Sequence, residues 1–148
     1  MTLHLLQYNQ SDRTKLTICI IKPELVMVSA LNAISERRPN PWATLAVVES
    51  ERDGELLRRH FDEQFKQEPG KPLQLPRHTK ELNLFLLTFN QHYTQPQVSV
   101  IPTTKACGIA RTKAGALLPH NWATISIVHE EKDGKLMREM INDRLRHP

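Results

Sequence analysis

The sequence predicts an α+β fold of two tandem ββαβα repeats that pack with pseudo-twofold symmetry, with antiparallel-rich sheets and helices on one face. Seventeen residues from Trp42 are matched by seventeen from Trp122, with nine positions identical. Residues 3–10 likewise match residues 84–91. We therefore divide the chain into a first repeat (1–66), a proline-rich linker (67–82) and a second repeat (83–148).

Each repeat begins with two predicted strands. The first repeat places them at residues 3–10 and 16–21, and the second at residues 84–91 and 96–101, where β-branched side chains are frequent. A single-residue loop deletion reconciles the spacing of the two copies. The tryptophan-led segments 42–48 and 122–128 are the predicted third strands.

A short helix is predicted between the second and third strands. Residues 24–36 follow Pro23 and place Val28, Leu31 and Ile34 at three-residue spacing, as in an amphipathic helix. The matching residues 103–118 contain Gly108 and Gly115, so we expect that helix to be frayed or partly a loop.

A longer helix closes each repeat. The Asp-Gly pairs at Asp53 and Asp133 are compatible with a hairpin turn or with an N-cap, and the helical period that follows favours the N-cap. The apolar stripes recur at corresponding places, namely Leu57, Phe61 and Phe65 in the first repeat and Met137, Ile141 and Leu145 in the second. We expect each of these helices to pack on a sheet. The linker contains Pro69, Pro72 and Pro76 and is predicted to be extended.

The composition indicates a globular, cytoplasmic protein. No apolar run is long enough to span a membrane, and the first residues lack the profile of a signal peptide. The net charge is +4 over 148 residues, and the stretch from Leu82 to His129 has no acidic residue. A basic stretch of this kind permits a polyanionic partner.

The motifs of enzymes and cofactor sites are missing from the sequence. Cys19 and Cys107 lie far apart, which suggests buried apolar thiols rather than a disulfide or a metal site. There is no glycine-rich phosphate loop, no metal-ligand spacing and no local nucleophile-base arrangement. We therefore predict a protein that is not an enzyme and has no cofactor or metal. An enzyme with its site between the repeats would need a pocket lined by polar groups of shifted pKa.

Elements around the repeated tryptophan resemble the MmcQ/YjbR family. In that family a Ser-Pro-Glu-Leu-like helix start is followed by an Asn-x-x-His-Trp-like strand, Asp-Gly and a C-terminal helix. The same order is seen for Lys22-Pro23-Glu24-Leu25, Trp42 and Asp53-Gly54, and for His120-Asn121-Trp122. The family's helical N-terminal segment has no counterpart before Leu3. The resemblance implies a frataxin-like, double-wing DNA-binding fold and no catalytic residue.

The leading hypothesis is a binding protein that contacts DNA or RNA through basic side chains, mainly of the second repeat and the linker. The alternative is a protein–protein adaptor or regulator, for example a homodimer, without nucleic-acid binding. Scattered rather than clustered cations would favour the adaptor. Trp42 and Trp122 either stack on bases or lie in the core, and the core is favoured. The candidate contact residues are Arg37, Arg38, Lys71, Arg77, Lys80, Lys105, Arg111 and Lys113.

Overall fold

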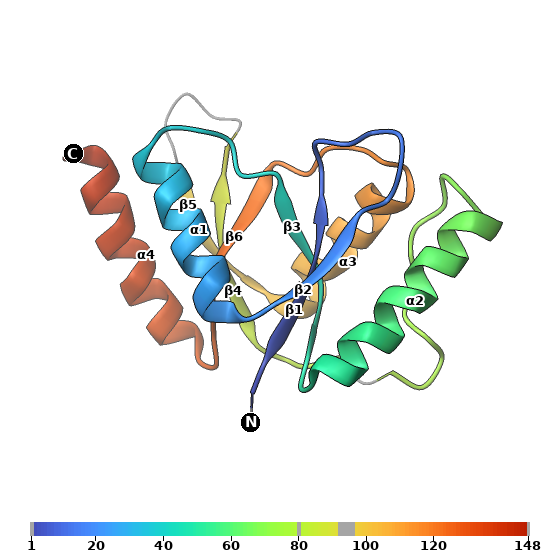
Figure 1. Cartoon of the computed structure of the whole chain (residues 1–148). Helices are drawn as coiled ribbons and strands as arrows, with labels where there is room; N and C mark the ends of the chain where they lie inside the picture. Colours follow the sequence, from blue (N-terminus) through green and yellow to red (C-terminus); the bar gives the residue numbers. More distant parts are fainter. Residues whose placement is uncertain (1, 80, 92–96, 148) are drawn as a thin grey trace.

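A computed structural model of the chain describes residues 2–79, 81–91 and 97–147 (Figure 1). The protein has an α+β fold with two antiparallel three-stranded sheets and four helices. The first half contains β1 (His4–Asn9), β2 (Ile18–Ile21), α1 (Pro23–Ser35), β3 (Trp42–Val48) and α2 (Glu51–Gln67). The second half contains β4 (Phe85–Asn90), β5 (Gln97–Pro102), α3 (Thr103–Gly115), β6 (Trp122–Val128) and α4 (Glu131–Arg146).

The two sheets have the same strand order and the same irregularity. The first runs β2-β1-β3 and the second β5-β4-β6. The register of β1 against β3 shifts between Leu6 and Gln7, and that of β4 against β6 shifts between Leu87 and Thr88. Because Leu6 pairs with Ala46 and Gln7 with Thr44, Leu45 is the extra residue of a β-bulge.

The helices connect the two halves. Each long helix packs on the sheet of its own half, α2 on the first and α4 on the second. Each short helix packs on the other half, because α1 contacts β6 and α3 contacts β3. In Figure 1, α1 and α4 therefore lie together on one side of the molecule, and α2 and α3 lie together on the other.

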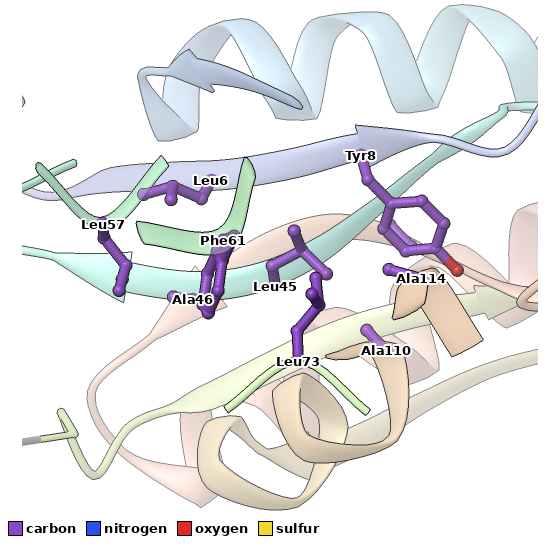
Figure 2. Packing of buried hydrophobic residues seen from close by; sticks show 10 residues of the cluster. Leu6, Tyr8, Leu45, Ala46, Leu57, Phe61, Leu73, Ala110 and Ala114 are labelled. Atoms are coloured by element: carbon purple, nitrogen blue, oxygen red, sulfur yellow. The ribbon is translucent and has the colours of Figure 1, made fainter. Parts of the chain in front are cut away.

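The long helices bury the stripes that the sequence predicts. Leu57 and Phe61 of α2 pack with Leu45 of β3, and Phe65 lies against the same cluster (Figure 2). Met137, Ile141 and Leu145 of α4 pack in the same way on the second sheet. Burial of such side chains contributes about 1.5–3 kcal/mol each.

The packed face of α1 differs from the prediction. Its buried residues are Val26, Ala30 and Ala33, whereas Val28 and Leu31 are 56% and 40% exposed. Alanine side chains let the helix approach β6 closely, so the small residues rather than the larger ones face the sheet. The expected stripe of Val28, Leu31 and Ile34 is wrong at its first two positions.

The prediction that the second short helix is frayed is also wrong. α3 is continuous from Thr103 to Gly115. Its buried residues include Ala106, Ala110 and Ala114, so contacts with β3 and the linker outweigh the low helix propensity of its glycines.

The long helices begin before the Asp-Gly pairs. In α2 the N-cap is Ser50, whose hydroxyl accepts a hydrogen bond from the backbone N–H of Asp53 at 3.1 Å. The prediction of Asp53 and Asp133 as N-caps or hairpin residues is therefore wrong, because both lie in the first turn of a helix. An acidic side chain there is favoured by the helix dipole.

Candidate functional site

The segment after α2 lies along α3. Residues 68–79 contain no helix or strand and pass between α2 and α3 (Figure 1). The backbone N–H of Gly70 donates to the carbonyl of Gly115 at 2.8 Å, and that of Leu73 donates to the carbonyl of Arg111 at 3.1 Å. These bonds use carbonyl groups in the last turns of α3.

Side chains of both neighbouring helices hold the same segment. Leu73 is 3% exposed and inserts between the first sheet and α3 (Figure 2). The backbone N–H of Gln74 donates to Oε1 of Gln64 at 2.9 Å, and the carbonyl of Gln74 lies 3.0 Å from Nε2 of His60. We call residues 70–76 the strap, because they close the space between α2 and α3.

Arg111 connects α3, β3 and the linker. Its Nη1 donates to the carbonyl of Leu45 at 2.9 Å, and its Nη2 contacts Oε1 of Glu81 at 3.0 Å. Leu45 is the bulged residue of β3, so the guanidinium satisfies a carbonyl at the irregular position of the sheet. The candidate phosphate contact Arg111 is thus buried and already paired within the protein.

A cavity of about 490 Å³ lies beside this ion pair. Its walls are the end of β3, the first turns of α2, the linker and the first turns of α3. The lining residues are Ala46, Val47, Val48, Glu49, Asp53, Leu56, Leu57, Leu75, Pro76, Thr79, Glu81, Leu82, Thr103, Cys107 and Arg111. Most of this surface is apolar, which is typical of ligand pockets.

The Cys107 thiol of the cavity is not activated as a nucleophile. Burial raises the pKa of the Cys107 thiol to about 12, so the thiol is protonated at neutral pH. Among the described residues, no group of three or more His, Cys, Asp or Glu side chains could hold a metal ion. The cavity is therefore a mostly apolar pocket whose thiol is protonated.

The two halves meet through residues at corresponding positions. Thr44 and Thr124 share a hydrogen bond of 2.6 Å between their hydroxyl oxygens. Gln91 pairs with both the N–H and the carbonyl of Asn40, at 2.6 and 2.9 Å. Gln10, which corresponds to Gln91 in the sequence match, accepts from the backbone N–H of His120. Both glutamines end strands predicted from the sequence (3–10 and 84–91), and their recurrence in the two repeats is the signal that could have indicated this contact.

His120 is buried as the neutral imidazole. Its Nδ1 accepts from the backbone N–H of Trp122, as Oδ1 of Asn40 accepts from that of Trp42. Burial, assisted by the nearby charge of Lys113, lowers the pKa of His120 to about 4.

This pKa predicts acid sensitivity. Between about pH 6.5 and pH 4 the unfolded chain binds a proton at His120 that the folded protein does not, so the stability present above pH 6.5 is lost as pH falls. We expect a loss of about 2 kcal/mol between pH 7 and pH 5. Urea unfolding of wild type and His120→Asn at both pH values measures it. The asparagine keeps the acceptor, and an equal pH dependence in both proteins would contradict the prediction.

The remaining basic candidates lie on several separate segments. Lys105 and Lys113 are at opposite ends of α3, about 12 Å apart along the helix axis. Arg37 and Arg38 follow α1, and Arg38 pairs with Glu36. Lys71 and Arg77 are exposed in the linker, and Lys80 lies outside the described residues. Because Arg111 is buried, the seven candidates that the structure describes do not form one exposed stripe.

Several smaller expectations have a mixed outcome. Trp42 and Trp122 are half-buried and lie at the starts of β3 and β6. Cys107 is buried as expected, whereas Cys19 is only partly buried. Within the described ranges, none of the helices is long and apolar enough to cross a membrane.

Comparison of the chain with family models, with curated proteins and with solved structures gave no match. The resemblance to the MmcQ/YjbR family therefore stays a prediction, and the function is argued below from the geometry alone.

Proposed function

We propose that this chain is a non-enzymatic protein-binding adaptor, formed by duplication of one ββαβα unit and related internally by a pseudo-twofold axis. The matched bulges, the Thr44–Thr124 contact and the two glutamine contacts support the duplication. Contacts between corresponding residues are what a twofold interface produces. The adaptor function is inferred mainly from one observation, an exposed apolar face on α1 and α4.

This face corresponds to the one that the strap covers on α3 and α2. Leu31 of α1 stands at the position of Arg111 in α3, and is 40% exposed where Arg111 is 9% exposed. Met140 of α4 stands at the position of His60 in α2 and is 64% exposed. Leu25 and Val28 extend the apolar surface along α1. Exposed apolar side chains gathered in this way mark interaction sites.

The strap indicates what the face binds. On α2 and α3 the occupant is a segment without helix or strand that inserts one leucine and gives backbone hydrogen bonds to two helices. A partner segment with an extended backbone and a leucine fits α1 and α4 in the same way. The position of Gly115 in α3 is occupied by Ser35 in α1, and a serine has the Cβ atom that the strap leaves no room for. A bound segment must therefore lie farther from the end of α1 than the strap lies from the end of α3.

The charge of the face adds a second requirement. Arg144 of α4 occupies the position that Gln64 has in α2. Gln64 accepts a hydrogen bond from the N–H of Gln74 in the strap, whereas the guanidinium of Arg144 can only donate hydrogen bonds. Met140, which occupies the position of His60, cannot form the hydrogen bond that His60 makes with the carbonyl of Gln74. A carboxylate in the partner segment, next to its leucine, complements Arg144. The proposed partner is therefore an extended protein segment that carries a leucine with a carboxylate beside it.

A peptide titration tests this function. The probe is a peptide of the sequence of residues 70–77 in which Gln74 is replaced by Glu, added to isotope-labelled protein and followed by NMR. We expect amide shifts on α1 and α4, and affinity weakened about tenfold by Leu31→Asp or Arg144→Glu. Ile109→Asp is the matched control, because Ile109 is an exposed apolar residue of α3.

Each other outcome of the titration has a defined meaning. Shifts confined to α2 and α3 would show that the peptide replaces the strap, and would count against the α1–α4 face. An equal loss of affinity in Ile109→Asp, or no shift at millimolar peptide, would also overturn the proposal.

Nucleic-acid binding is the second candidate function, and one observation favours it. The loops 10–17 and 36–41 lie at the same end of the sheets and are joined by a hydrogen bond of 2.8 Å from the N–H of Gln10 to the carbonyl of Pro41. They carry the exposed cations Arg13, Lys15, Arg37 and Arg38. Anisotropy titrations with DNA and RNA at about 50 and 200 mM salt test it, since phosphate contacts weaken steeply with salt. An Arg37→Ala, Arg38→Ala double variant that binds as wild type would remove this candidate.

A further inference from the structure

We propose that the cavity between β3, α2, α3 and the linker binds a small molecule with an apolar body and a cationic group, such as an alkyl- or arylalkylammonium ion. This site is distinct from the α1–α4 face and does not depend on the adaptor function. Its volume of about 490 Å³ is within the range of small-molecule pockets.

The body of the ligand follows from the walls. The apolar lining residues include Val47 of β3, Leu57 of α2, Cys107 of α3, and Leu75 and Leu82 of the linker. These side chains offer no charge, since burial keeps the Cys107 thiol protonated. Removing an alkyl or aromatic group from water into such a pocket is favourable by roughly 25 cal/mol per Å² of apolar surface.

The charge of the ligand follows from the polar lining. Among the lining residues that the structure describes, Arg111 is the one cation, and its guanidinium is already paired with Glu81. Glu49 and Asp53 also line the cavity and are exposed to solvent. Neither forms an ion pair with a cation in the described part of the chain. Two carboxylates beside a low-dielectric wall attract a cation and repel an anion.

The corresponding region of the second half has a different composition, which makes the site specific to the first half. His129 stands at the position of Glu49, and Leu31 at the position of Arg111. The cavity therefore combines the acidic pair, the buried ion pair and the linker in a single place.

A matched ligand series tests the proposal by isothermal titration calorimetry. The probes are 2-phenylethylammonium, 2-phenylethanol and 3-phenylpropanoate, which share an apolar body and differ in charge. We expect the cation to bind at least about tenfold more tightly than the alcohol, and the anion not to bind. The double variant Glu49→Gln, Asp53→Asn should bring the cation to the affinity of the alcohol and leave the alcohol unchanged.

Two further variants keep the result interpretable. Glu51→Gln, Glu63→Gln removes two exposed carboxylates of α2 that do not line the cavity, and should keep the preference for the cation. Leu75→Trp fills the cavity from the linker, where the side chain is only partly buried, and should abolish binding of both ligands. Absence of binding by all three probes at millimolar concentration, or equal loss of preference in the Glu51, Glu63 variant, would overturn the proposal.

Discussion

Replacing Gly115 with alanine is expected to lift the strap from α3 and to lower the free energy of unfolding by about 3–4 kcal/mol. A Cβ atom at this position would lie 1.8 Å from the carbonyl oxygen of Lys71 and 2.8 Å from its carbonyl carbon. Because the colliding atoms are backbone, no rotamer change relieves the clash. The strap must move, and the bonds of Gly70 and Leu73 to α3 are lost with it.

Gly108→Ala is the matched control for this substitution. Both glycines are in α3, but a Cβ at Gly108 meets only the flexible Nη2 of Arg111, at 3.8 Å. Alanine there should be neutral or stabilise the helix by up to about 1 kcal/mol. Urea unfolding and limited proteolysis of residues 68–79 measure both variants. Equal stability of the two proteins, with an uncut strap in Gly115→Ala, would contradict the role that we assign to the close approach.

Arg111→Met is expected to lower the free energy of unfolding by about 3 kcal/mol. Methionine keeps much of the volume but leaves the carbonyl of Leu45 without its donor and Glu81 without its cation. The Glu81 side chain is 31% exposed and can regain water, so most of the cost comes from the buried carbonyl. Urea unfolding measures the change.

The controls for Arg111 separate the ion pair from the carbonyl contact. Glu81→Gln keeps a hydrogen-bond acceptor for the guanidinium and should cost less than about 1 kcal/mol. Lys113→Met, on the same helix, removes a cation without a hydrogen bond to β3. If Lys113→Met destabilised the protein as much as Arg111→Met, loss of charge rather than loss of the Leu45 contact would explain the effect.

The strands and the long helices could be predicted because their signals are local and occur twice. The tryptophan-led strands and the stripe of Leu57, Phe61 and Phe65 have the periods of a strand and a helix, and their counterparts repeat them. The packed face of α1 could not be predicted in the same way. Whether Ala30 or Leu31 of this helix is buried depends on the contact with β6, which lies about 90 residues farther along the chain.

The candidate site was harder to predict, because its parts come from distant segments. The cavity is assembled from residues 46–57, which contain the end of β3 and the start of α2, from the linker and from α3, and no short motif contains all three parts. One signal was present in the repeat. Arg111 stands where the first copy has Leu31, and a cation that replaces an apolar residue within an alanine-rich helix suggests a buried partner.

The packing of each short helix on the opposite sheet has a consequence for synthesis of the protein. α1 leaves the ribosome early, but β6, on which it packs, emerges about 90 residues later. At elongation rates of 5–20 residues per second, this delay is roughly 5 to 20 seconds. During that interval Ala30 has no sheet to cover it, because its neighbours Leu87, Val98 and Ile125 are not yet all made. The helix is then exposed to chaperones and to neighbouring chains on the same message.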